Sequence, residues 1–564
     1  MAKNNYDSYT REQLIAELKK LNKRKKYGLV WEEEKTKEKF EADTEGKLPV
    51  LVEDTKREIN TDADKPTHIL IEGDNYHALS VLNYTHAKSI DVIYIDPPYN
   101  TGARDWKYNN DYVETEDAYR HSKWLSFMNN RLKLTKKLLS PSGVLVCSID
   151  HNEQENLGIL LRELFPEKEI SCITLIHNPS GIQGKNFSYN HEFAYFVYPR
   201  DKKVIGLQNR EHNPDIRPLR DVSKGDHLRT DAANCFYPVF VKNNKIIGFG
   251  DVCEDSFHPK SANVLRKDGV MEIYPIDPQG NERKWVFARQ TVENIKDELT
   301  IEFNKQRKIW DVIRKKVRFN YKTVWDDKRY NANIYGTQLL ASILNTPFPF
   351  PKSLYTVKEC IQAVIHNKDR ATILDFFAGS GTTGHAVLEL NKEDGGNRKF
   401  ILCTNNENNI CTEVCYPRIK KVIKGYTSTK GEKVKGFGEN LKYYITNFVS
   451  SEPTHRNKKL LTDKSIEMLC LKENTFDEVF DKKDFYIFKS KVRFTAILFN
   501  ELKMEEFKKE IKKLKMPASI YVFSLEGDDF REEFEDLQND ITLCSIPEAI
   551  LKVYRRIYGT VKGK

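Results

Sequence analysis

The chain lacks long apolar segments and shows no disulfide pattern. Nowhere in its 564 residues does a run reach the roughly 18 consecutive apolar residues of a membrane helix. The start, MAKNNYDSYT, has no apolar core of the signal-peptide type. The 10 cysteines are scattered, several of them within strand-like runs, which is typical of reduced thiols rather than a disulfide framework. We therefore expect a cytoplasmic protein without a membrane span.

Two kinds of functional site are also missing from the sequence. Cys411 and Cys415 stand four residues apart, but no second Cys/His pair at zinc spacing is near them. Helix packing is the better interpretation of this pair, and no metal site is predicted. The sequence also has no lysine-bearing phosphate loop and no helicase module.

Positive charge is concentrated in one stretch. The chain has 91 basic and 82 acidic residues, an excess of nine, and residues 303–322 hold eight Lys/Arg with a single acid among aromatic residues. We expect a helix there, whose basic and aromatic side chains suit phosphate contacts and base stacking. A solvated amphipathic helix fits the composition equally well. The nucleic-acid hypothesis assigns backbone contacts to Arg314, Lys315, Lys316 and Arg318.

The apolar pattern divides the chain into several parts, as expected for this length. From residue 68 to 199, strand-like runs alternate with helical periodicity in the α/β manner. The alternation fails between about 200 and 330, where short β-like runs include a hairpin signal at Asn243-Asn244, and it then resumes. The predicted parts are a helical extension (1–60, helical over 9–40), a first α/β half (61–200), an insert (201–330), a second α/β half (331–450) and a C-terminal α+β domain (451–564).

The run DVIYIDPPYN raises a specific question. Its first half reads as a buried strand, which stops on an acid, two prolines and a tyrosine, Asp96 to Tyr99. Two prolines alone are enough to end a strand, and an isolated DPPY tetrapeptide is no proof of a site. The alternative is that the strand delivers a carboxylate, a rigid turn and an aromatic ring to one point.

A second run, ILDFFAGSGTTGHAV, reads as a strand, a glycine-rich turn and a helix start. Gly379 and Gly381 let the backbone approach a ligand closely, and the helix start offers free N–H groups. The spacing with Gly384 fits a dinucleotide turn, and a phosphate loop is excluded because no lysine follows Gly381. Asp375 at the strand tip suits the cationic amino-acid end of a ligand, which favours S-adenosylmethionine over NAD.

Together, these runs resemble the amino DNA methyltransferases that act on exocyclic nitrogens. The order, with the DPPY strand first and the FAGSG turn after an insert, is similar to their β class. The match is closer to the modification (Mod) subunits of type III restriction–modification systems, through KKYGLVWE, DVIYIDPPYNTG, GVLVCSIDHNE, DFFAGSGTTGHAV, LCTNNENNICTEVCYPRIKKVIKGY and IPEAILKVYRR. The resemblance implies a Rossmann-like methyltransferase fold with circularly permuted motif order, and makes the insert a target-recognition domain.

Carried over position by position, the resemblance implies a role for each motif residue. The catalytic turn is Asp96, Pro97, Pro98 and Tyr99. Contacts to S-adenosylmethionine fall to Asp74, Asp375, Phe376, Phe377, Ala378, Gly379, Ser380, Gly381, Thr382 and Glu407. The ribose-binding acid commonly stands at a strand tip, whereas here Thr404-Asn405-Asn406 precede Glu407. Asn178 and His191-Glu192 resemble the lining of the target-base pocket, although His191 fits an ordinary strand edge equally well.

The implied chemistry explains why the strand ends as it does. Adenine N6 is a poor nucleophile because its lone pair is delocalised into the ring. A carboxylate at Asp96 and the carbonyl of Pro97 would accept its two N–H bonds, and Tyr99 would stack on a base taken out of the duplex. Methyl transfer is then direct, without a covalent enzyme intermediate.

The resemblance also implies partners and leaves competitors. Double-stranded DNA is the substrate, a homodimer is usual in the family, and a separate ATP-dependent restriction subunit is implied. An orphan adenine methyltransferase would look similar. An N4-cytosine enzyme is disfavoured because that specificity more often goes with Ser in place of Asp96. A catalytically idle DNA-binding subunit is disfavoured by the intact DPPY.

Overall fold

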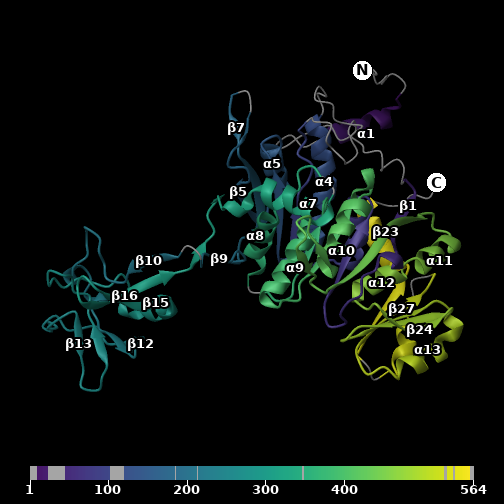
Figure 1. Ribbon diagram of the computed structural model, residues 1–564. Helices are drawn as coiled ribbons and strands as arrows, with labels where there is room; N and C mark the ends of the chain where they lie inside the picture. Colours follow the sequence, from purple (N-terminus) through teal and green to yellow (C-terminus); the bar gives the residue numbers. More distant parts are fainter. Residues whose placement is uncertain are drawn as a thin grey trace. The chain divides into compact units, whose positions relative to one another are not determined.

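The structure is a computed structural model that describes residues 9–22, 45–101, 120–183, 186–211, 214–345, 348–366, 368–525, 530–537 and 540–558. The chain forms two compact units: Met1–Gly206 with Lys322–Lys564, here the major unit, and Leu207–Tyr321, here the inserted unit (Figure 1). Within the part of the chain that the structure describes, no helix has the length and apolar character to cross a membrane.

The major unit is built on a ten-stranded mixed sheet. Its central strands β2, β20, β19, β3 and β4 are parallel, and β8 runs antiparallel between β4 and β5. In order across the sheet the strands are β1 (Lys47–Glu53), β23 (Asn440–Ser450), β2 (Thr67–Glu72), β20 (Lys399–Thr404), β19 (Thr372–Asp375), β3 (Ile90–Ile95), β4 (Leu139–Ile149), β8 (His191–Pro199), β5 (Lys168–Ile176) and β18 (Val324–Trp325).

The central strands are continuous apolar runs because helices cover both faces of a parallel sheet. On one face, α3 contacts α4 and α4 contacts α5; on the other, α8 contacts α9 and α9 contacts α10. The helices are α3 (Asn75–Thr85), α4 (Arg120–Leu138), α5 (Gln154–Leu164), α7 (Leu339–Leu344), α8 (Leu354–Ile365), α9 (Thr382–Asp394) and α10 (Tyr416–Lys424). A π-helical turn, Ile410–Cys415, leads into α10.

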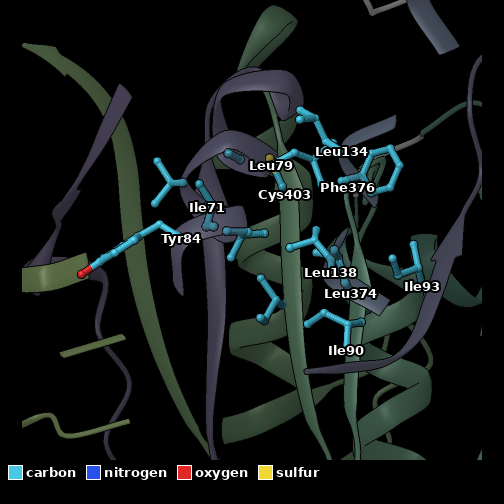
Figure 2. Close-up of a cluster of buried hydrophobic side chains, with 14 of the residues drawn as sticks. Ile71, Leu79, Tyr84, Ile90, Ile93, Leu134, Leu138, Leu374, Phe376 and Cys403 are labelled. Atoms are coloured by element: carbon cyan, nitrogen blue, oxygen red, sulfur yellow. The ribbon is translucent and has the colours of Figure 1, made fainter. Parts of the chain in front are cut away.

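The core beneath α3 and α4 draws on strands from both halves of the sequence. Figure 2 shows Ile93 of β3 and Leu374 of β19 beside side chains of the two helices, among them Leu79 and Leu138. These residues are fully buried. The two α/β halves, separated in sequence by the insert, therefore share one hydrophobic core.

The sheet has a topological switch point between β3 and β19. From β3 the chain moves through α4 to β4 on one side, and from β19 it moves through α9 to β20 on the other. In such sheets the crevice at the carboxyl ends of the two diverging strands is where ligands bind. The prediction of a Rossmann-like α/β fold is confirmed.

The inserted unit is β-rich and has its own core. Leu219, Val239, Trp285 and Val312 are among its fully buried residues, and the predicted Asn243-Asn244 turn, with both residues at positive φ, joins β11 to β12. Its elements are β9 (Leu207–Asn209), β10 (Asp215–Pro218), β11 (Val239–Lys242), β12 (Lys245–Phe249), β13 (Asn263–Leu265), β14 (Met271–Ile273), α6 (Arg289–Val292), β15 (Leu299–Asn304), β16 (Ile309–Lys316) and β17 (Arg318–Asn320).

The predicted helix over residues 303–322 is wrong. The stretch forms most of an antiparallel hairpin, β15 and β16, followed by β17. The physical reason lies in the alternation of the strand, where Val312 faces the core while Ile313 lies on the other face. Lys308, at positive φ, stands in the turn.

The sequence predicts a helix near the start of the chain, over residues 9–40. It is present as α1 (Arg11–Asn22), and residues 23–40 lie outside the described residues.

The C-terminal segment forms a five-stranded sheet with flanking helices and belongs to the same compact unit. Its elements are α11 (His455–Asp463), α12 (Ile466–Glu473), β24 (Asp477–Lys482), β25 (Phe485–Lys489), β26 (Phe494–Leu498), α13 (Met504–Ile511), β27 (Ala518–Phe523), β28 (Ile541–Ile546) and α14 (Glu548–Tyr558).

Candidate active site

The two sequence motifs meet at the switch point. Leu374 pairs with Ile93 in the register of β19 and β3, so Asp375 and Asp96 end adjacent parallel strands at the same edge of the sheet. The two carboxyls are close enough that the charge of Asp96 raises the pKa of Asp375. Two motifs about 280 residues apart in the sequence thus form one site.

The DPPY turn is held rigidly by its surroundings. The indole Nε1 of Trp124 on α4 donates a 2.7 Å hydrogen bond to the carbonyl of Pro98. Asn100, fully buried and at positive φ, donates to the buried carboxylate of Glu153. Among the described residues none donates to the Pro97 carbonyl, so this acceptor remains available beside Asp96.

Asp96 and Tyr99 contact an ion pair that the sequence motifs do not contain. The ammonium of Lys352, in the loop before α8, donates to the hydroxyl of Tyr99 and to Oε2 of Glu192 on β8. Its Nζ lies 3.4 Å from Asp96 Oδ1 and 4.6 Å from the centroid of the Tyr99 ring. The Tyr99 hydroxyl donates to Glu192 Oε2 at 3.1 Å.

Burial and charge act in opposite directions within this cluster. Burial raises the pKa of the Asp96 carboxyl, Lys352 partly offsets the rise, and Glu192 adds to it. Burial opposes ionisation of Glu192 as well, but the ammonium of Lys352 and the other partners of this carboxylate, among them the Tyr99 hydroxyl, together outweigh burial and lower the pKa of Glu192. The two carboxylates in turn outweigh burial at Lys352 and raise its pKa.

The glycine-rich turn after β19 is shaped for a close approach. Gly379 has a φ of +50° and a Cβ at this position would meet only the Phe377 carbonyl, at 3.8 Å. Gly381, with a φ of +78°, caps the start of α9 without a side-chain cap. The helix N-terminus is therefore open to a ligand.

Asp375 lies beneath this turn and is buried. Its carboxylate accepts hydrogen bonds from the Phe377 N–H at 2.9 Å and from the Thr383 hydroxyl at 2.5 Å. Burial raises the pKa of Asp375 to about 7, although these two bonds oppose the rise. Its protonation state is therefore balanced near neutral pH.

The remaining predicted residues of the turn serve its conformation. The side chains of Ser380 and Thr382 contact the buried guanidinium of Arg418 on α10, at 3.2 and 2.8 Å. The Ala378 N–H donates to the Cys403 carbonyl, and Phe376 and Phe377 belong to the core. Sequence reasoning missed Arg418, whose only signal is a basic residue on the apolar face of a helix.

Asp74 ends β2 near the same edge of the sheet. Its carboxylate caps α3 by accepting from the Tyr76 N–H at 2.8 Å, and it lies 3.4 Å from the buried guanidinium of Arg131. Asn75 donates to the Phe376 carbonyl at 2.9 Å, which joins α3 to the turn after β19. Asp74 and Asp375 thus lie on either side of β20.

The sequence assigns the ribose hydroxyls to Glu407, but the residues after β20 differ in their exposure. Glu407 begins a 3₁₀ turn, three positions beyond the end of the strand, and is exposed. Asn405, directly after the strand, has a buried Oδ1 without a hydrogen-bond partner among the described residues. A buried acceptor without a partner is unfavourable unless a ligand satisfies it.

Other predicted residues are not part of this cluster. His191 lies on the opposite face of β8 from Glu192, because strand side chains alternate, and contacts Asn190 and Phe193. Arg314, Lys315, Lys316 and Arg318 belong to the inserted unit. Arg314 already has a carboxylate partner, Glu298, at 2.6 Å, whereas Lys315 and Arg318 are exposed.

Comparison with known proteins decides the family. The DNA methylase family matches residues 90–414, which include the DPPY strand, the insert and the glycine-rich turn. The chain belongs to the DNA methylase family. These enzymes transfer methyl groups to DNA from S-adenosylmethionine, so the predicted activity, DNA substrate and cofactor are confirmed at the level of the family.

Individual relatives come from two kinds of restriction–modification system. The type II methyltransferase M.KpnI of Klebsiella pneumoniae is 30% identical over 400 residues, 67% of this chain and 90% of the relative. The EcoPI Mod subunit of a type III system, from Escherichia phage P1, is 29% identical over 479 residues, 73% of this chain and 71% of the relative. The predicted similarity to Mod subunits is confirmed.

Solved structures give a weaker likeness. The crystal structure of the M1.HpyAVI–SAM complex matches 63% of this chain and 97% of its own at 12% identity and a TM-score of 0.28. A likeness at this level adds nothing to the assignment made from the sequence relatives.

Proposed function

We propose that this DNA methylase transfers a methyl group from S-adenosylmethionine to adenine N6 within a specific DNA sequence, as the modification and specificity subunit of a type III system. The observation that carries the proposal is the meeting of Asp96 and Asp375 at one switch point. This meeting supports the proposal because a carboxylate that could accept the target amino group then lies beside a turn suited to the methyl donor.

The residues at the cofactor side fit S-adenosylmethionine. The open space over Gly379 leaves room for a ligand against the backbone, and the uncapped start of α9 offers N–H groups. Asp74 and Asp375 supply negative charge for a cationic ligand, and the unpartnered Oδ1 of Asn405 supplies an acceptor at the tip of β20. When bound, the cofactor supplies an electrophilic methyl group.

Asn405 is a better candidate than Glu407 for the ribose hydroxyls. A ribose hydroxyl is a hydrogen-bond donor, and Asn405 Oδ1 is a buried acceptor that has no described partner. Glu407 is exposed on the following turn. We therefore move this assignment by two positions.

On the substrate side, the chain's own groups bind and orient the target base. Asp96 and the Pro97 carbonyl accept the two N–H bonds of the amino group, which concentrates its lone pair on nitrogen. Trp124 fixes the turn through the Pro98 carbonyl, so the two acceptors are held in place before the base arrives. The ring of Tyr99 stacks on the base.

The inserted unit supplies sequence recognition in this proposal. It is compact, carries the basic hairpin β15–β16 and has its own core. As a Mod-type subunit the chain would act as a homodimer in the cytoplasm with an ATP-dependent restriction partner. The similarity to M.KpnI favours a second candidate, a stand-alone type II enzyme, which would need no such partner.

Expression in a host without DNA methylation, followed by single-molecule sequencing, tests the activity. We expect N6-methyladenine in one sequence context, and loss of the modification by about two to four orders of magnitude in Asp96→Ala. N4-methylcytosine, or undiminished methylation by Asp96→Ala, would contradict the proposal. Light scattering of the purified protein, with and without a co-expressed type III restriction subunit, separates the two candidate systems.

A further inference from the structure

The ammonium of Lys352 contacts the same two side chains that the proposed function assigns to the target base. It lies over the ring of Tyr99 and 3.4 Å from Asp96 Oδ1. The Lys352 ammonium also has a second anionic partner, Glu192, to which it donates a hydrogen bond. Lys352 can therefore leave Asp96 to a substrate without losing its own charge compensation.

The charges of the cluster show why two partners are needed. With Lys352 and Glu192 paired, the cluster carries one net negative charge, which is available at Asp96. Without the ammonium, two carboxylates would be buried side by side and share a proton. Without Glu192, the ammonium would have Asp96 as its one anionic partner in the cluster and would compete with the target amino group.

We propose that Glu192 and Lys352 are positioning residues that act as a charge-balancing pair: Lys352 keeps the Asp96 carboxylate ionised, and Glu192 holds the ammonium off it so that the target amino group can bind. This inference rests on the proposed function for the identity of that amino group. The structural part, the control of Asp96 by its two neighbours, is independent of which base is methylated.

Few other titratable groups among the described residues lie near Asp96, Glu192 and Lys352. Apart from Tyr99, the described residues within electrostatic reach of Asp96, Glu192 or Lys352 are Tyr94 on β3, Cys147 on β4, Asp150 after β4, His177 after β5, Cys360 on α8 and Asp375 on β19. Burial raises the pKa of the Tyr94 hydroxyl and of the Cys147 and Cys360 thiols, and lowers that of His177, so these four are neutral near pH 7. Lys352 is the one cation among them.

The inference predicts the order of the Asp96 pKa in four proteins. Lys352→Met removes the cation and leaves Glu192, so the pKa should rise above that of the wild type. Glu192→Gln removes the negative charge of Glu192 and leaves Asp96 as the acid beside Lys352, so the pKa of Asp96 should fall. The double variant lacks both charges and should lie between the wild type and Lys352→Met, because the effect of Lys352 on Asp96 exceeds that of Glu192.

Carbon-13 NMR of aspartate-labelled protein measures this order without turnover, with Asp96→Asn to assign the signal. In parallel, single-turnover methyl transfer is measured against pH. Asp96 acts as the carboxylate, so the rate increases as it ionises, and the acid limb should move to higher pH in Lys352→Met. Lys352→Arg should restore the wild-type limb, since it keeps the charge.

Two controls make the outcome decisive. Lys358→Met removes a lysine on α8 whose ammonium pairs with Glu393, and it should leave both the Asp96 titration and the rate profile unchanged. Thermal unfolding establishes that each variant is folded. Shifts of the Asp96 pKa in opposite directions for Lys352→Met and Glu192→Gln support the pair; shifts in one direction, or none, overturn it. A wild type that titrates as expected but methylates no DNA would instead refute the proposed function alone.

Discussion

At the scale of single residues, the site combines two buried acids whose environments differ. Asp96 has a cation within 3.4 Å, whereas Asp375 has hydrogen bonds to Thr383 and to the Phe377 N–H, and its pKa is raised to about 7 by burial. Asp96 is therefore positioned to accept a hydrogen bond. Asp375 ionises more readily when a cation binds nearby.

Binding of S-adenosylmethionine should therefore release a proton at mildly acidic pH. Below pH 7 Asp375 is largely protonated in the free protein, and a bound cationic group favours its carboxylate, so affinity should fall as the pH decreases below about 7. Calorimetry at pH 6 in buffers of different ionisation enthalpy measures the proton. A binding enthalpy that is the same in all buffers would show that Asp375 does not ionise on binding. Asp375→Asn, which cannot ionise, is the matched control.

At the scale of the element, the three glycines of the turn after β19 have different neighbours. A Cβ at Gly379 would meet nothing closer than 3.8 Å, one at Gly381 would lie 3.2 Å from Cys415 Sγ, and one at Gly384 would lie 2.7 Å from Ile419. The three glycines belong to one sequence motif, but of the three only Gly379 faces open space.

Gly379→Val should abolish cofactor binding while the protein stays folded. The side chain would occupy the open space above the turn, and the left-handed backbone would add about 1–2 kcal/mol of strain. Calorimetry with S-adenosylmethionine and thermal unfolding separate the two effects. Gly384→Val is the contrasting variant, because its side chain would collide with α10 and lower the unfolding temperature far more. Retained affinity in folded Gly379→Val would contradict the assigned role of the turn.

The basic residues of β16 and β17 have different neighbours, so their roles can be tested separately. Lys315→Gln and Arg318→Gln remove exposed charges, and each should lower the salt dependence of DNA binding by about one unit of slope without changing the unfolding temperature. Arg314→Gln removes the partner of Glu298 and the cation over Phe287, so it should lower stability as well. Binding titrations at several salt concentrations, on cognate and scrambled duplexes, give the slopes. Unchanged slopes would show that these basic residues do not contact DNA and are ordinary surface residues.

The sequence predicted those elements whose pattern is local and repeated. The apolar runs of β2, β3, β4, β19 and β20 were identifiable because both faces of a parallel strand are buried. The sequence predicts a helix where the structure has β16, because the high charge of this stretch obscures the alternation of Trp310 and Val312 with outward-facing residues.

Site residues could be predicted only where a motif surrounds them. Lys352 stands 253 positions from Tyr99, in the proline-rich run FPFPKS, and nothing local distinguishes it from other lysines. The sequence motif contains both His191 and Glu192, but only the contacts of Glu192 with Tyr99 and Lys352 show which of the two faces the site. Long-range contacts of this kind leave no periodic signal.

At the scale of the whole molecule, the inserted unit begins and ends in one antiparallel pair. Leu207 pairs with Asn320 and Asn209 with Arg318 in β9 and β17, and paired residues in such strands lie roughly 5 Å apart. The unit also has its own buried core. Its removal should therefore leave two nearby chain ends.

Replacing residues 207–321 with a short Gly/Ser linker should give a folded protein that binds S-adenosylmethionine but no longer methylates DNA at a specific sequence. The reason is that the sheet, the switch point and both acids lie in the major unit. Calorimetry and sequencing of host DNA are the two measurements. A variant that keeps the wild-type sequence context would show that recognition resides elsewhere.

The position of β19 between β20 and β3 has a consequence for synthesis on the ribosome. The nascent chain exposes the DPPY strand early, yet the neighbour that completes the centre of its sheet and the lysine that compensates Asp96 emerge only after the insert. A product that terminates within the insert has neither the glycine-rich turn after β19 nor Lys352. Under the proposed function, we therefore expect incomplete chains to methylate no DNA, so that unselective marking of a genome would need the complete sheet.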